Sequence, residues 1–457
     1  MSSFHAAPAP TALTSAGRNA ILASAFLAWM FGGVALGLFP LAARPATIAL
    51  LYPAPPSASA SGPKTLTKAQ EAVIGKWFAR YTCAFLTGAG VGGLLFGWMG
   101  DRYGRKNALA WSVLCFTGFT APCAWATSPE QLLVLRFLAC LGVGGVWPNG
   151  IALASEAWSE VSRPTLAGIF GTAANVGIVG IALWGIRFAV TKENWHEVML
   201  VCAAPFPLGL LIWFFVPESP RWLASRGQRE GTTAKPQVSA WEVFKPPYLR
   251  LTLLGTLLGT IPLFGNWSGG NWLVPWSDQA AERAAATQVS SAPRPDNARA
   301  NQARKAWTQF ARSSGASIGS LIGGWLASLL GRRLVYFLIS IGSWGVSVYI
   351  FRYLTPLDPN FLYWTFALGF VTTIYFGWLP LFLPELFPVE VRSTGSGVTF
   401  NFGRFVTAGG VLANGILMSV FESDYAKVLA VTSSVYLLGM FVIWLAPDTS
   451  QQKLGVE

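Results

Sequence analysis

A single arginine, Arg404, stands inside an otherwise charge-free apolar stretch that runs from residue 393 to residue 421. It lies 12 residues beyond Arg392, which corresponds to about 18 Å along a helix. A charge at that depth in a bilayer is costly unless it faces water or a partner. A guanidinium group binds a carboxylate through two parallel hydrogen bonds. Arg404 is therefore predicted to anchor an anion, and the alternative is a structural arginine that caps free helix carbonyls.

The other residue types that do chemistry are absent from the middle of the apolar stretches. None of the 20 acidic residues and neither His5 nor His196 falls near the centre of such a stretch. The five cysteines lie in apolar runs without a C-x-x-C spacing, which favours buried small side chains over a metal or disulfide role. We therefore expect no catalytic residues, no metal site and no cofactor.

The composition is that of a membrane protein. Of the 457 residues, 53% are hydrophobic and only 11% are charged, and the mean hydropathy is +0.47. Soluble domains carry about 25% charged residues, so much of this surface must face lipid. The net charge of +12 is assigned to short loops that fix membrane topology, not to a nucleic-acid partner.

Twelve stretches are long and apolar enough to cross a bilayer as helices, which takes about 20 residues each. Their apolar residues run continuously rather than alternating, which argues against a barrel. The stretches are 19–43, 81–100, 107–129, 137–155, 164–186, 198–217, 251–277, 313–331, 334–351, 359–384, 393–421 and 428–447. A further charge-free run at 45–63 contains prolines and serines and is predicted to be a loop.

Three sequence matches indicate an internal duplication. "GWMGDRYGRK" at 97–106 returns as "GWLASLLGRR" at 324–333, Glu156 and Arg163 return as Glu385 and Arg392, and "PES" at 217–219 returns as "PDT" at 447–449. The offsets are 227, 229 and 230 residues. Six spans per half is an even number, so the halves are parallel repeats. We expect a six-helix N-half (1–216), a cytoplasmic linker (217–250) and a six-helix C-half (251–457).

The loop after the second span resembles the signature loop of the major facilitator superfamily, Gly-x-x-x-Asp-Arg-x-Gly-Arg-Lys. "RFLACLGVGG" at 136–145 is similar to that family's fourth-helix motif, and "PESPRWL" at 217–223 is similar to its sugar-porter motif. The resemblance implies an all-α membrane protein in which twelve transmembrane helices form two parallel six-helix repeats, the major facilitator fold. It also implies solute transport by alternating access.

In that family the signature loop latches the two halves while the cytosolic side is shut. Asp101 at a helix end can bond the free amide groups of a neighbouring helix N-terminus. The second copy has Ser328 and Leu329 in place of the Asp-Arg pair, which predicts a weaker latch. The alternative is a topology anchor without a switching role. The residues assigned to gating are Gly97, Asp101, Arg102, Gly104, Arg105, Lys106, Glu156, Arg163, Arg332, Arg333, Glu385 and Arg392.

The repeat also predicts residues that share the depth of Arg404. Subtracting the offset of 229 gives Asn175 in the fifth span of the N-half. Polar residues at matched depth, one from each half, are typical of a central site between repeats. Asn401 lies one helical turn before Arg404 and shares its face.

The seventh span contains "TIPLFGNWSGGNWLVPW" at 260–276, where prolines and glycines make a regular helix improbable. We predict an interruption whose free backbone groups line a cavity. Trp267 and Asn271 are predicted to contact the solute there, with an interfacial aromatic belt as the alternative for the tryptophan. Trp29 and Tyr375 also fall near mid-depth, where they face either the cavity or the packed core.

Four other arginines are predicted to lie at the outer interface, where long side chains reach toward water. Counting residues along the spans places Arg80, Arg136, Arg187 and Arg312 there. The two long outer loops, 53–76 and 278–307, show no pattern typical of a binding site, although the second could hold a short surface helix.

The first span lacks the acids that a related group of carriers uses. "FLAWMFGGVALGLFPL" at 26–41 resembles the same segment of organic-acid and sialic-acid proton symporters, which carry acidic residues three apart. Those positions are Gly32 and Ala35 here. The resemblance therefore implies that the usual proton site has been lost.

These observations predict a secondary transporter that moves a small organic anion as a facilitator or exchanger, without a proton site of its own in the membrane. The alternatives are a carrier of sugars or other neutral solutes, a proton-coupled symporter, and a membrane sensor without turnover. We expect no enzyme activity and no nucleic-acid partner. We expect a monomer in a bacterial inner membrane, surrounded by lipid, with both termini in the cytosol.

Overall fold

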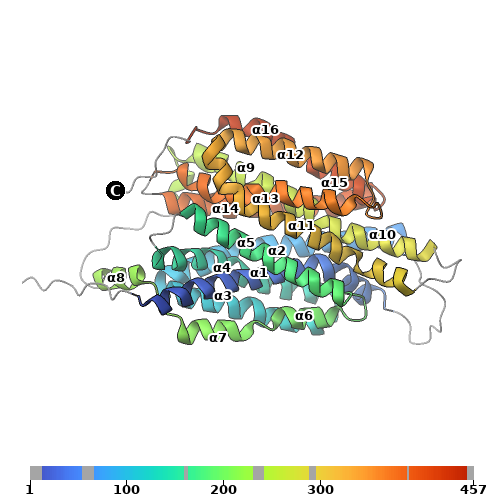
Figure 1. Cartoon of the computed structure of the whole chain (residues 1–457), viewed down its shortest axis with the longest axis horizontal. Helices are drawn as coiled ribbons and strands as arrows, with labels where there is room; N and C mark the ends of the chain where they lie inside the picture. The colour runs from blue at the N-terminus through green and yellow to red at the C-terminus, as the bar shows by residue number, and fades with distance from the viewer. Residues whose placement is uncertain are drawn as a thin grey trace, which may run out of the picture.

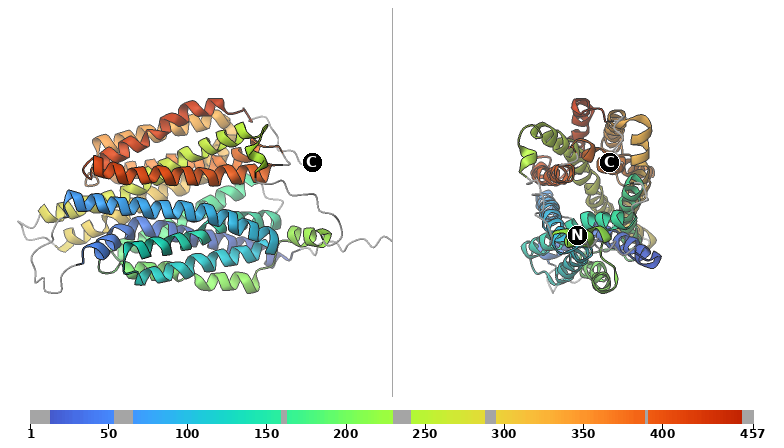
Figure 2. Two further views of the ribbon diagram at one scale, coloured as in Figure 1. Left: turned by 180° about the vertical axis from the view of Figure 1, so that it is seen from behind. Right: turned by 90° about the vertical axis from the view of Figure 1, so that its left-hand side faces the viewer.

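The computed structural model describes residues 13–53, 66–158, 163–229, 241–287, 295–388 and 391–449. Its long helices run roughly along one common axis (Figure 1). Helices of the N-half form the lower layer in that view, and α12 to α16 of the C-half form the upper one. Figure 2 shows the same helices from behind and along their common axis.

The N-half contains α1 Ser15–Leu51, α2 Lys68–Tyr103, α3 Arg105–Thr120, η1 Ala121–Trp125, α4 Pro129–Ala157, α5 Arg163–Arg187, α6 Trp195–Ala203 and α7 Phe206–Phe215. Between the halves lie α8 Pro220–Arg229 and η2 Glu242–Phe244. The C-half contains α9 Leu249–Phe264, η3 Gly265–Gly269, η4 Gly270–Trp272, α10 Leu273–Thr287, α11 Pro295–Leu330, α12 Arg332–Tyr353, α13 Phe361–Glu385, α14 Arg392–Val420, α15 Tyr425–Ser433, α16 Val435–Val442 and η6 Ile443–Leu445.

Within the residues that the structure describes, all the elements except α8 and η2 of the linker belong to twelve helical crossings. Within the described residues, 10 helical segments are long and apolar enough to cross a membrane by length and composition. Two more crossings are the irregular unit from α9 to α10 and the long helix α11, which begins with a polar segment. The predicted all-α, twelve-helix membrane fold is therefore confirmed.

The bundle has two ends that can be told apart by their loops. We call the end where α2 meets α3 the motif end, because Gly97–Lys106 lies there together with α8. The opposite end, where α10 finishes and α11 starts, is the far end. In Figure 1 the motif end lies on the left and the far end on the right.

The predicted loop at 45–63 is wrong for its first residues. Helix α1 continues through Pro40 and Pro45 to Leu51. Residues 41–47 are almost fully buried, and the Thr47 hydroxyl donates to the Ala43 carbonyl at 2.7 Å. Packing on all sides compensates here for the backbone hydrogen bonds that proline removes.

The predicted interruption of the seventh span is confirmed. After α9 the chain makes a π-helical turn, η3, and a 3₁₀ turn, η4, before α10 begins. Arg312 of α11 braces this break, because its guanidinium donates to Asn266 Oδ1 at 3.0 Å and to Asn271 Oδ1 at 2.8 Å. Arg312 is buried, so its side chain does not reach outward toward water as predicted.

Small residues let the helices pack backbone to backbone. A Cβ added at Gly92 in α2 would lie 1.9 Å from the Leu141 carbonyl oxygen of α4. In the C-half, a Cβ at Gly369 in α13 would lie 1.9 Å from the Arg312 carbonyl oxygen of α11. Such contact is typical of membrane helices, where close packing replaces the hydrophobic effect. Two seams join the halves, α2 against α14 and α5 against α11.

Candidate functional site

A small cavity lies where α1, α2 and α4 of the N-half meet the break in the seventh span. Its walls include the rings of Phe39, Tyr81, Phe85 and Trp267, together with the polar side chains of Arg136 and Asn271. The Trp267 ring lies 4.3 Å from that of Phe85, measured between centroids, so a C-half ring closes an N-half wall. This position between the halves is where carriers built from repeats bind their solutes.

Arg136 supplies the charge of this cavity. Its side chain is only 3% exposed, and its guanidinium carbon lies 3.9 Å from the Phe39 ring centroid and 5.6 Å from that of Phe85. Nη1 donates to the Ala35 carbonyl at 3.2 Å, whereas Nε has no hydrogen-bond partner among the described residues. Within the same residues no carboxylate forms an ion pair with Arg136.

The prediction that Arg136 reaches outward to the interface is therefore wrong. Counting residues from Glu156 gives the position of the Arg136 Cα atom along the helix, but it does not give the face of the helix from which the side chain projects. Helix α4 begins at Pro129, so Arg136 is almost two turns inside it and points at α1 and α2. The sequence signal for this site is the arginine that begins "RFLACLGVGG", because a charged side chain within an apolar helix usually faces the interior of the bundle or a water-filled cavity.

Arg404 lies on the seam between α14 and α2. Its Nη1 donates to the Ala89 carbonyl of α2 at 3.0 Å and to Asn401 Oδ1 at 3.3 Å, and its guanidinium lies 4.9 Å from the Phe400 ring. The side chain is half-buried. The guanidinium thus links the two halves through a backbone carbonyl, which is the geometry expected for the structural alternative. Ala89 is one helical turn from Phe85 of the cavity wall.

Asn175 occupies the matching place on the other seam. Its amide donates to the Gly171 carbonyl at 3.2 Å and to Ser320 Oγ of α11 at 3.4 Å. Arg404 and Asn175 therefore occupy corresponding positions on opposite seams, α14 with α2 and α5 with α11. No described contact joins the two side chains.

The remaining residues predicted to bind solute divide between the cavity and the core. Trp267 and Asn271 line the cavity with Arg136. Trp29 lies half-buried against Trp147, with their ring centroids 5.1 Å apart. Tyr375 is fully buried inside the C-half, where its hydroxyl is 2.6 Å from Ser340 Oγ and its ring packs on Tyr336.

At the motif end of the N-half, the gating residues form one polar cluster with the linker. Arg105 pairs with Asp101 at 2.6 Å and approaches Glu156 at 3.8 Å. Glu156 in turn accepts a hydrogen bond from Ser219. Trp222 donates its indole N–H to the Asp101 carbonyl at 3.0 Å, which ties α8 to the signature loop. Gly97 has open space around it, and Arg102 lies over the rings of Trp98 and Tyr103.

Glu218 of the linker has the role that the sequence suggested for an aspartate. Its carboxylate accepts the Lys106 amide at 3.0 Å, at the N-terminus of α3. Gly104 makes this approach possible, because its φ is +107° and a Cβ there would lie 2.1 Å from Glu218 Oε2. Burial raises the pKa of the Glu218 carboxyl, and the backbone amides of Ser219 and Lys106 act in the opposite direction. The "PES" sequence is thus a cap for α3.

The C-half repeats the arrangement with different partners. Arg332 forms two hydrogen bonds with Glu385, at 3.1 and 2.8 Å, and Thr449 donates to the same carboxylate at 2.6 Å. Thr449 and Ser219 are the matched residues of "PDT" and "PES", so the hydroxyl-to-glutamate contact is present in both halves. Arg332, Glu385 and Thr449 all belong to the C-half, whereas the Glu156 contact joins the N-half to Ser219 of the linker. Arg333 binds the Ala446 carbonyl and Arg392 the Phe387 carbonyl, whereas the side chain of Arg163 lies outside the described residues.

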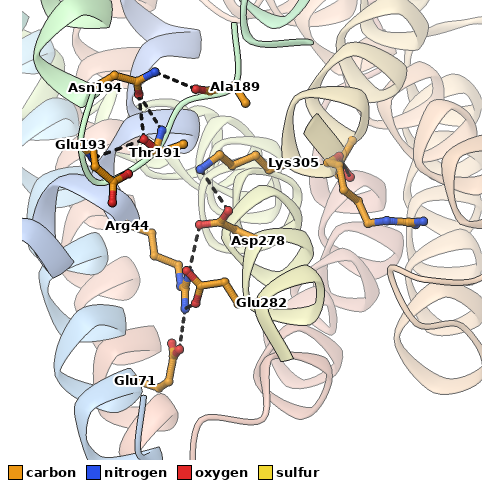
Figure 3. A network of polar contacts seen from close by, with 11 residues as sticks. Arg44, Glu71, Ala189, Thr191, Glu193, Asn194, Asp278, Glu282 and Lys305 are labelled. Atoms are coloured by element: carbon orange, nitrogen blue, oxygen red, sulfur yellow. Dashed lines mark hydrogen bonds and ion pairs between the residues drawn. The ribbon is translucent and has the colours of Figure 1, made fainter. Parts of the chain in front are cut away.

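Five charged residues at the far end were not predicted to act together. Arg44, Glu71, Asp278, Glu282 and Lys305 form a continuous ion-pair network (Figure 3). Three of them lie in the segment 278–307, which was expected to carry no binding site.

Comparisons with known proteins fit this architecture. Residues 46–241 match the family model described as "Sugar (and other) transporter". The cis,cis-muconate transport protein of Acinetobacter baylyi is 27% identical over 339 residues, covering 73% of this chain and 76% of that protein. The 4-hydroxybenzoate transporter of the same organism is 37% identical over 148 residues, or 32% of each chain.

The fold is also similar to that of the inward-open xylose transporter of E. coli. The TM-score is 0.66, with 14% identity, and the match covers 95% of this chain and 98% of that one. At this identity the likeness concerns the fold alone. In its sequence motifs, its twelve described crossings and these matches, the chain is similar to multi-pass membrane transporters of the major facilitator type.

Proposed function

We propose that this transporter carries small organic acids, including acids with an aromatic ring. The observation that carries the proposal is Arg136, a buried cation without a carboxylate partner among the described residues, in a cavity walled by aromatic rings. In the form described, the cavity has room for only about one water molecule, so a solute would enter as the two halves move apart. A carboxylate would then supply the missing charge, and the rings of Phe39, Phe85 and Trp267 would pack against a planar solute. The relatives described above as transporters of muconate and of 4-hydroxybenzoate support the same class.

The proposal includes a mode of transport and an orientation. The N-half and C-half rock about the cavity, so that it opens alternately to each side. Asn271, Trp29, Asn175, Asn401 and Arg404 are proposed to face the solute along its path. The motif end and both termini are proposed to face the cytosol, where the basic signature loop agrees with the positive-inside rule. A carrier of neutral sugars is the second candidate, favoured by the "PESPRWL" motif and the description of the family model.

Uptake into proteoliposomes tests the substrate class. Purified protein is given radiolabelled 4-hydroxybenzoate, muconate or xylose, and unlabelled 4-hydroxybenzamide is used as a competitor. The amide has nearly the shape of the acid but lacks its charge. We expect the two acids to be transported and the amide to compete at least about 100-fold less well than unlabelled acid, because the arginine loses its ion-pair partner. Xylose uptake without acid uptake would establish the neutral-solute candidate instead.

The signature-loop cluster is expected to set the rate of this transport. Asp101→Asn and Arg105→Ala each remove one partner of the 2.6 Å pair that closes the α2–α3 turn. We expect uptake of 4-hydroxybenzoate to slow about tenfold while its affinity changes less than about twofold, because the cluster acts on the populations of states rather than on the cavity. The matched control is Lys245→Gln, which breaks the exposed pair with Glu242. Wild-type rates in both variants, at equal protein per vesicle, would remove the gating role.

A further inference from the structure

The far-end network joins the two halves through buried charges. Arg44 of α1 pairs with Glu71 of α2 at 2.5 Å, with Asp278 of α10 at 3.0 Å and with Glu282 of α10 at 2.6 Å. Lys305 of α11 pairs with Asp278 at 3.0 Å. Figure 3 shows Arg44 in the middle, with Glu71 on one side and the α10 carboxylates on the other. The side chains of Arg44, Glu71 and Lys305 are all less than 5% exposed.

The network divides into two neutral pairs along the boundary between the halves. Arg44 and Glu71 both belong to the N-half, and Asp278 and Lys305 both belong to the C-half. If the halves separate at this end, each pair stays together, and only the contacts of Arg44 with α10 break. Separation therefore leaves none of these buried charges without its partner, the situation that costs several kcal/mol per ion. Glu282, which is left over, is 51% exposed and can be solvated by water.

A second contact lies next to the network on the same boundary. Gln309 of α11 donates to the Gly37 carbonyl of α1 at 2.8 Å. Gly37 has no room for a side chain there, because a Cβ would lie 2.9 Å from Gln309 Nε2. Helix α1 is thus held against the C-half by a backbone contact as well as by Arg44.

We propose that Arg44 is the gating residue of the far end: its contacts with Asp278 and Glu282 hold that end shut, and the transport cycle breaks those two contacts while the pairs Arg44–Glu71 and Asp278–Lys305 remain. This role depends on transport by alternating access and not on which solute is carried. Arg44 is a positioning residue, since it does not line the cavity that contains Arg136.

Distances between spin labels at the far end test the gate without any solute. Labels are attached at Glu130→Cys, at the start of α4, and at Asn360→Cys, before α13, both of which are exposed. The background lacks the five native cysteines. The key variant is Arg44→Gln with Glu71→Gln, which removes the N-half pair as a unit and leaves Asp278 paired with Lys305. We expect the ratio of the long-distance to the short-distance population to rise at least about tenfold.

The controls separate a gate from general loosening. Lys68 and Glu422 also pair across the halves at the far end, at 2.6 Å, but they are 70% and 72% exposed. Lys68→Gln is expected to leave the distances unchanged, because exposed pairs contribute little. The converse variant, Asp278→Asn with Glu282→Gln and Lys305→Gln, removes both carboxylates of α10 that contact Arg44 and leaves the Arg44–Glu71 pair. It is expected to open the end as the first variant does. A wild-type distribution in either of these two variants with a wild-type melting temperature would overturn the proposal, as would an equal shift in Lys68→Gln.

Discussion

Arg136→Ala is expected to abolish binding of 4-hydroxybenzoate at concentrations that saturate the wild type. Removing one partner of a buried, hydrogen-bonded charge pair costs about 2–5 kcal/mol, which corresponds to about 30-fold to 5,000-fold in affinity. The rings of Phe39 and Phe85 would still offer an apolar wall, but the carboxylate would lose its charge partner. Arg136→Lys keeps the charge without the planar pair of donors and is expected to recover only part of the affinity. Binding is measured by isothermal calorimetry on the purified protein.

A folding defect is distinguished from a lost anchor by the protein's stability. Arg136 in the absence of solute is an unpaired buried charge, so its removal is expected to leave the melting temperature unchanged or higher. Added 4-hydroxybenzoate should raise the melting temperature of the wild type and not that of Arg136→Ala. A variant that still binds the acid as the wild type does would exclude Arg136 from the site and undermine the organic-acid proposal.

The role of Arg404 is tested by the same calorimetric measurement of 4-hydroxybenzoate binding, which distinguishes a solute anchor from a structural arginine. If it anchors the solute, Arg404→Ala and Arg404→Lys lose binding as Arg136→Ala does. If its contact with the Ala89 carbonyl is its whole purpose, Arg404→Ala binds normally and loses only stability. The matched control is Thr172→Val, because Thr172 also contacts the opposite half through a carbonyl, that of Ser317, without a charge. That control is expected to bind like the wild type.

The sequence was sufficient for the fold, because the information lies in long apolar runs and in a repeat. Twelve crossings, the irregular seventh span and the matched pair of "PES" and "PDT" all follow from local patterns. The course of α1 beyond Pro45 does not, because what keeps that segment helical is burial by residues distant in the chain. The directions of the Arg136 and Arg312 side chains were wrongly predicted from depth counting for a related reason. Depth counting locates a residue along a helix, whereas function depends on the face from which the side chain leaves.

Long-range charge pairing was the part that the sequence could not provide. Arg44 and Asp278 are 234 residues apart, and each alone is typical of a residue at a membrane edge. Their contact depends on how α1, α10 and α11 meet at the far end, which no local pattern encodes. Arg404 was easier to find because it is conspicuous within its own span. Its partner, the Ala89 carbonyl, is a backbone group and leaves no sign in the sequence.

The structure indicates what the lack of an acidic residue at position 35 does to Arg136. The Ala35 carbonyl is the atom that accepts the hydrogen bond from Arg136. An acidic side chain at residue 35 would start next to this guanidinium and could pair with it, and solute binding would then compete with that pair. In this chain no such acid is present at residue 35, and Arg136 keeps its charge available for the solute. Proton coupling through a carboxylate that exchanges partners with Arg136 is therefore not expected.

Transport of a monovalent acid should consequently be electrogenic and should equilibrate the solute rather than concentrate it under a pH gradient. The measurement is 4-hydroxybenzoate accumulation in proteoliposomes with an imposed gradient of about one pH unit, the membrane potential being clamped with potassium and valinomycin. A symporter that moves one proton with each anion would reach about a tenfold concentration ratio, since the gradient is worth about 1.4 kcal/mol. We expect a ratio near one for the wild type. Ala35→Asp is the matched variant, and it is expected either to block transport by holding Arg136 or to make accumulation depend on the gradient. Uphill accumulation by the wild type that collapses with a protonophore would contradict the prediction, and would mean that a proton travels on another group or on the bound carboxylate itself.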